Sequence, residues 1–270
     1  MKIAFISLLV LTAVVPLHGA DDVSKLPAEK LIDNLAEIDS EAPGLHGTAS
    51  VLGFIAEDKP LSFGGGVIGA PAPVVPPQMR ELARRGAAAL PQLINHLDDK
   101  RPTRLTVGAD FFMFREFSDE YDPKARSRAD STGIPKEYAN LMQKDFSGGY
   151  MVRIGDVCYA IIGQIVNRNL CAIRYQPTAG LIVNSPIEAP VLIRRVRKDW
   201  DGVDAHAHKA SLIADAQSGD ALWNFGPALV RLRFYYPDEY NRLKTGLFRK
   251  KIIEFESNEE IQAHGAKGKE

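Results

Sequence analysis

The residues best suited to metal chemistry are two histidines and an aspartate in one short segment. Asp204, His206 and His208 are separated from one another by single alanines. On an extended segment alternate side chains point to the same side, so both imidazoles and the carboxylate would face one ion. Together these ligands suit zinc, iron or manganese. The pattern predicts a divalent transition-metal site at Asp204, His206 and His208, whereas the alternative interpretation is a polar, solvated loop between two helices.

A second group of polar residues forms a basic face on a predicted helix from 190 to 200. Apolar residues at helical spacing would turn inward, leaving four cations outward: Arg194, Arg195, Arg197 and Lys198. Such a face could meet an acidic partner or lipid head groups. Because acidic residues are also abundant nearby, a merely solvated face is the simpler alternative.

Nucleophilic catalysis finds little support in the residue pattern. The chain contains no Gly-x-Ser-x-Gly, Ser-x-x-Lys or His-Glu-x-x-His motif, so no catalytic residue is predicted. A helix capped by Asp156 and running to about Asn167 would end roughly 14 Å beyond Cys158. A disulfide to Cys171 requires Cα atoms within about 7 Å. Two separate buried thiols are therefore favoured over a disulfide, which an oxidising compartment would permit.

Helices must position most of these residues. Apolar spacing and proline or polar start signals predict helices over 25–38, 156–167, 190–200 and 209–217. Pro227 and Pro237 favour a further helix over 227–236, with a strand as the alternative because apolar residues alternate there. Two short strands are expected between 171 and 184, around a turn at 177–180. The segment 40–77 is rich in glycine and proline and is expected to be irregular. The last residues, 259–270, are typical of a polar tail that frays.

The clearest helical pair lies between 76 and 103, with the sequence PPQMRELARRGAAALPQLINHLDDKRPT. Gly86 interrupts the first helix and Pro91 opens the second. This segment resembles a HEAT-type helical hairpin. The resemblance implies a stacked-helix surface that binds partners, and it brings no catalytic residues. No clean second copy follows at a fixed period, so a repeat array is not predicted.

The N-terminus has the composition of an export signal. Lys2 supplies one positive charge, an apolar run covers 3–17, and Ala20 precedes Asp21. These features predict a signal peptide over 1–20, with an uncleaved membrane anchor as the alternative. No second long apolar run follows, so no transmembrane segment is expected after removal of the signal. The formal net charge of −1 becomes −2 without Lys2, which excludes overall attraction to nucleic acid.

Together these observations predict a mainly α protein with helical-hairpin (HEAT-like) packing, long irregular loops and a few short strands. We expect the signal (1–20) to precede a single helical domain (21–258), followed by the tail (259–270). The leading hypothesis is a non-enzymatic protein, periplasmic or secreted, that presents a helical surface to a protein partner. The alternatives are a metal-dependent hydrolase using Asp204, His206 and His208, and a structural protein of the cell envelope.

Overall fold

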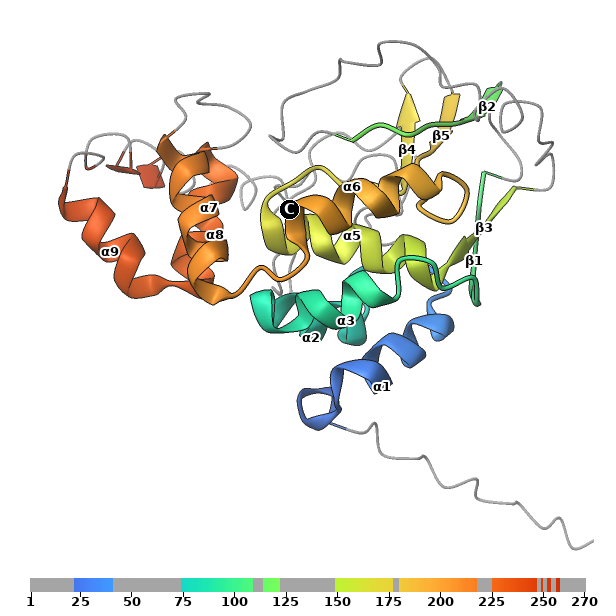
Figure 1. The fold of residues 1–270 in the computed structure, drawn as a ribbon, viewed down its shortest axis with the longest axis horizontal. Helices are drawn as coiled ribbons and strands as arrows, with labels where there is room; N and C mark the ends of the chain where they lie inside the picture. Colours follow the sequence, from blue (N-terminus) through green and yellow to red (C-terminus); the bar gives the residue numbers. More distant parts are fainter. Residues whose placement is uncertain are drawn as a thin grey trace, which may run out of the picture.

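The computed structural model describes residues 22–40, 74–108, 114–121, 149–176, 180–217 and 225–246, with a few more positions between 249 and 257. Helices occupy most of this part, which confirms the mainly α class. Figure 1 shows their arrangement. The α-helices are α1 (Ala28–Asp33), α2 (Pro77–Arg84), α3 (Leu90–Asn95), α5 (Ile154–Val166), α6 (Pro190–Trp200), α7 (Ala205–Gln217), α8 (Gly226–Tyr235) and α9 (Pro237–Thr245).

Helix α5 is the centre of the fold. Every one of its residues is buried, and α1, α2, α3 and α7 all contact it. Its sequence, IGDVCYAIIGQIV, is apolar except for Asp156 and Gln164, as expected of a helix surrounded by other elements. Helix α6 packs against α3 and buries Leu192, Val196 and Trp200 in the same apolar cluster. The shorter helices and the strands are thus arranged around α5.

Two small sheets lie beside the helices (Figure 1). In the first, β1 (Pro102–Val107) pairs antiparallel with β3 (Tyr150–Arg153), with an irregularity between Pro102 and Thr106. In the second, β5 (Gly180–Val183) is central, parallel to β2 (Phe114–Phe117) and antiparallel to β4 (Ile173–Gln176). The β4–β5 pair confirms the two strands predicted between 171 and 184.

Several predicted helix boundaries differ from the observed ones. Helix α6 spans 190–200 as predicted, and the helix expected over 227–236 is α8, Gly226–Tyr235, with Tyr236 as its C-cap. The N-cap of α5 is Arg153 rather than Asp156, because the Asp156 side chain reaches back to accept the Arg153 amide as the third residue of a capping box. Helix α7 begins at Ala205 instead of Lys209. The predicted helix 25–38 consists of α1 followed by a 3-10 turn, Asn34–Glu37.

A polar junction joins α5 to the C-terminal helices, which have an apolar cluster of their own running from Leu212 to Ile252. The junction comprises Arg168, His208, Asp215 and Arg231. Side chains from three of these residues donate to carbonyls of the last turn of α5. The pairs are Arg231 Nε to Gln164 O (2.6 Å), His208 Nε2 to Ile165 O (2.9 Å) and Arg168 Nη1 to Val166 O (3.2 Å). They satisfy carbonyls that a helix end leaves without intrahelical partners.

Gly86 forms a second attachment point for the C-terminal helices. It lies between α2 and α3 with a φ of +57°, a left-handed conformation that glycine adopts at little cost. A Cβ at this position would lie 2.8 Å from the Tyr235 ring of α8. That ring is held in place, since the Tyr235 hydroxyl donates to Ala83 O at 2.5 Å and the ring meets His208 edge to face.

Alanine in place of Gly86 should therefore lower the free energy of unfolding by about 1–3 kcal/mol, from backbone strain and from pressure on Tyr235. Gly202→Ala is the matched control, because Gly202 has a φ of +73° and a Cβ there would meet nothing within 4 Å. Urea denaturation of both variants measures the difference. Equal losses would show that the contact with Tyr235 adds nothing to the strain.

The remaining expectations fall on other parts of the chain. The predicted signal 1–20, most of the glycine- and proline-rich segment 40–77 and the predicted tail 259–270 lie outside the described residues. Among the helices that are described, none has the length and apolar character required to cross a membrane.

Candidate binding site

The three residues of the predicted metal site do not share one face. The segment expected to be extended is helical, with α7 beginning directly after Asp204. Residues two apart on a helix are separated by about 200° around its axis. Accordingly, His206 is exposed and His208 is fully buried, while Asp204 Oδ1 accepts the amide of Ala207 at 2.8 Å. The structure therefore corrects the local geometry on which the metal hypothesis depended.

His208 already uses both of its ring nitrogens. Nε2 donates to Ile165 O at 2.9 Å, and Nδ1 lies 2.9 Å from the Tyr236 hydroxyl. Burial lowers the pKa of His208, with Arg231 and Arg168 adding to the effect. In the described ranges, no group of three or more histidine, cysteine, aspartate or glutamate side chains is arranged to hold a metal ion.

The cysteines offer no reactive pair either. Cys158 and Cys171 are both free thiols, as favoured from the sequence. Cys158 is fully buried on α5, and burial raises its pKa well above the ordinary value, so the nucleophilic thiolate is disfavoured. Cys171 is half-buried rather than buried as expected, and its Sγ lies 3.0 Å from Asn169 Oδ1.

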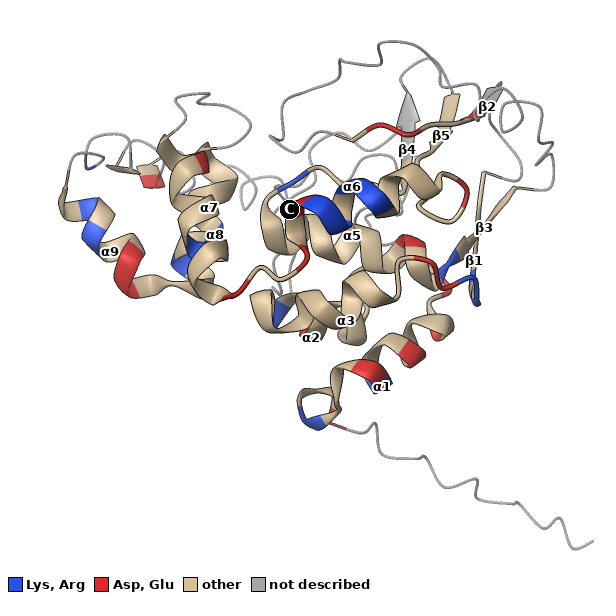
Figure 2. Cartoon of the chain, in the orientation of Figure 1, with Lys and Arg blue, Asp and Glu red and all other residues tan. Residues whose placement is uncertain are grey.

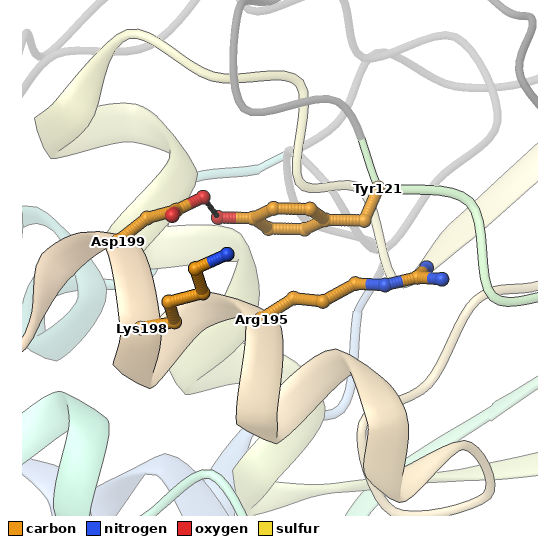
Figure 3. Close-up of a pocket in the computed structure, with 4 residues that line it drawn as sticks. All are labelled: Tyr121, Arg195, Lys198 and Asp199. Carbon is orange, nitrogen blue, oxygen red and sulfur yellow. Dashed lines mark hydrogen bonds between the residues drawn. The ribbon is translucent and has the colours of Figure 1, made fainter.

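A recess of about 300 Å³ lies between α6 and the loop that follows β2. Its lining residues are Tyr121, Arg195, Lys198 and Asp199. Figure 3 shows the Tyr121 side chain extending toward Asp199, with Arg195 and Lys198 projecting from α6. Positions 195, 198 and 199 share one face of the helix because they are three and four residues apart. The recess thus combines an aromatic wall, two cations and one carboxylate.

Hydrogen bonds hold the walls of the recess in place. The Tyr121 hydroxyl donates to Asp199 Oδ2 at 2.8 Å and accepts from Trp200 Nε1 at 3.2 Å. Burial raises the pKa of Tyr121, and the Asp199 carboxylate raises it further, so the hydroxyl keeps its proton. Arg195 Nη1 lies 2.7 Å from Asp119 O and 3.2 Å from Asp119 Oδ2. Trp200 is itself buried in the apolar cluster, so this hydrogen bond ties the Tyr121 hydroxyl to the core.

Beside the recess, α6 carries a basic ridge made of Arg194, Arg197 and Lys198. All three side chains are exposed, and none forms an ion pair with any described residue. Figure 2 shows the basic stretch of α6 in blue. The last turn of a helix favours cations, which accounts for Arg197 and Lys198 but not for Arg194 in the middle of the helix. Lys198 belongs to both the ridge and the recess.

The sequence pattern identified the basic residues of this site but not the aromatic wall. Tyr121 lies 78 positions from Asp199, beyond the reach of helical or strand periodicity. Its place after a strand is a weak signal, because many loops begin in the same way. The sequence did not identify Asp199 as a site residue, because it stands next to a run of other charged residues.

Comparisons of the chain with family models, with curated proteins and with solved structures found no match.

Proposed function

We propose that this chain is a non-enzymatic exported protein that binds a protein partner through helix α6 and the recess beside it. The observation that carries the proposal is the basic ridge, three exposed cations without an ion pair in the described structure, next to a preformed recess. Binding sites commonly combine an aromatic surface with a few fixed polar groups. Arginine and tyrosine are also among the residues enriched at protein interfaces.

The helices behind α6 are suited to support such a surface. Helix α3 contacts α6, and both α2 and α3 contact the buried helix α5. We propose that the α2–α3 pair, which resembles a HEAT-type hairpin in sequence, acts as a rigid backing for α6. The composition of residues 1–20, which resembles that of a signal peptide, supports the proposal of export.

Site-specific photo-crosslinking in the producing cell tests this function. The full-length chain carries a photoreactive amino acid in place of Arg197, which is exposed on the ridge, or in place of Asn241, which is exposed on α9. We expect an adduct with a second protein from position 197, recovered from the exported fraction, and none from position 241. The additional substitution Arg194→Glu should reduce the yield of this adduct several-fold. The absence of an adduct from position 197, or equal adduct yields from positions 197 and 241, would contradict the proposal.

A further inference from the structure

The basic ridge is a local cost to the folded protein. Arg194 stands three residues before Arg197 and four before Lys198, so the three charges are neighbours on one face of α6. Like charges at these spacings destabilise a helix. No described carboxylate pairs with any of them, although Asp119 does pair with Arg195 on the adjoining face. The ridge therefore adds no ion pair to the described structure and leaves three cations open to a partner.

The recess adds directional groups to this positive surface. Arg195 uses Nη1 for its contacts with Asp119, which leaves the N–H groups of Nε and Nη2 for a ligand. Lys198 has no partner in the described part of the chain and stands where ridge and recess meet. The Asp199 carboxylate accepts from Tyr121 and has lone pairs left for a second donor. The site can therefore bind carboxylates and one N–H donor together.

We infer, on the basis of the proposed function, that the partner segment is an extended acidic peptide. Its carboxylates lie against Arg194, Arg197 and Lys198, and a backbone N–H faces Asp199 in the recess. The spacing agrees, because Arg194 and Lys198 are separated by about 6 Å along the helix axis. Alternate residues of an extended chain are separated by about 7 Å. Acidic residues at alternate positions would therefore match the ridge.

An anionic membrane fits the same surface less well. A bilayer presents negative charge throughout, and Asp119 and Asp199 at the recess would be repelled by it. The large hydrophobic side chains exposed in the described structure are Val74, Met151, Phe234 and Ile253, none of which belongs to α6. Helices that lie on membranes bury an apolar face beside their basic one. A peptide can instead place a donor opposite Asp199.

The test uses the full chain and a fluorescein-labelled octapeptide of alternating glutamate and serine. A peptide with glutamine in place of glutamate is the probe control. Fluorescence anisotropy at low salt should show at least about tenfold tighter binding of the glutamate peptide than of the glutamine peptide. Each exposed ion pair contributes little by itself, so this difference is the sum over three pairs. Raising the salt to about 0.2 M should weaken binding, since the Debye length then falls below about 10 Å.

Two triple variants with the same charge change locate the binding. The first reverses the ridge (Arg194→Glu, Arg197→Glu, Lys198→Glu). The second reverses three lysines elsewhere on the described surface (Lys30→Glu, Lys100→Glu, Lys209→Glu). We expect the ridge variant to lose about tenfold in affinity and the control less than twofold. Circular dichroism verifies that both variants are folded.

Three results would overturn the acidic peptide as partner: no binding of the glutamate peptide at millimolar concentration, equal losses in the two triple variants, or binding only to vesicles that contain phosphatidylglycerol. If position 197 gives a protein adduct but the chain does not bind the glutamate peptide, the proposed function is supported and only the acidic peptide as partner is contradicted. Peptide binding at the ridge without any adduct would instead contradict the proposed function.

Discussion

Alanine in place of Asp215 should lower the free energy of unfolding by about 3–5 kcal/mol, which is the usual cost of removing one partner from a buried ion pair. Asp215 Oδ2 lies 2.5 Å from Arg168 Nη1 and 2.9 Å from Asn167 Nδ2. The side chains of Arg168 and Asp215 are only 7% and 11% exposed, so water screens the pair little. The substitution leaves a buried guanidinium facing the place where its carboxylate stood.

Guanidinium chloride denaturation, followed by far-ultraviolet circular dichroism, measures this loss. Asp215→Asn keeps the shape and one acceptor oxygen, so it should cost less than alanine. The double variant Asp215→Ala/Arg168→Met removes both charges and should also cost less than Asp215→Ala alone. The two residues would act independently if the double variant were less stable than Asp215→Ala by the whole loss that Arg168→Met causes by itself.

The same ion pair explains how the C-terminal helices are attached. Arg168 follows the end of α5 and also stacks over Trp200 at 5.1 Å, while Asp215 belongs to α7. The pair therefore connects α5, α6 and α7 at one point. His208 and Arg231 complete this polar junction by donating to the last turn of α5. His208, whose spacing suggested a metal ligand, thus donates a hydrogen bond to a carbonyl at the end of α5.

Local patterns predicted the elements whose signals lie within them. Pro190 at the start of α6, and the spacing of Leu192, Val196 and Trp200, set both the limits and the inward face of that helix. Pro227 and Pro237 likewise identified α8 as helical, although its alternating apolar residues also suited a strand. In these elements the period and the boundary signals agree, and burial follows from them.

Contacts between distant residues were not predictable in the same way. The pairing of β2 with β5 joins Phe117 to Val183, and the junction joins Arg168 to Asp215. Neither leaves a periodic pattern, because each depends on how whole elements pack. The start of α7 was missed for a different reason. Asp204 caps the helix with its side chain, whereas the alternation of His206 and His208 suggested an extended chain.

Stability should also depend on pH through Asp156, by about 3 kcal/mol between pH 4 and pH 7. Asp156 is fully buried, and burial raises its pKa from 3.8 to about 6. The folded protein therefore keeps this proton over a range in which the unfolded chain has lost it. The contribution is fully present below about pH 4 and is lost as the pH rises through about 6, because a tenfold difference in proton affinity is worth about 1.4 kcal/mol.

Three donors surround this carboxylate and make the dependence testable. Tyr150 and the amide of Arg153 donate to Oδ2, each at 2.9 Å, and Ser185 donates to Oδ1. Because Ser185 lowers the pKa of Asp156, Ser185→Ala should move the transition to higher pH. Because Asp156→Asn cannot titrate at this position, the stability difference between wild type and this variant isolates the contribution of Asp156. Other groups change both proteins alike, such as Asp99, whose pKa is lowered to about 2 and whose contribution is lost on acidification.

Urea denaturation of wild type and Asp156→Asn at several pH values between 4 and 7.5 measures this difference. Relative to the variant, the wild type should gain stability as the pH falls through 6. A wild type that instead gains stability over the variant as the pH rises would mean that the three hydrogen bonds outweigh burial. The folded-state pKa of Asp156 would then lie below its unfolded value, with the carboxylate stably charged inside the protein.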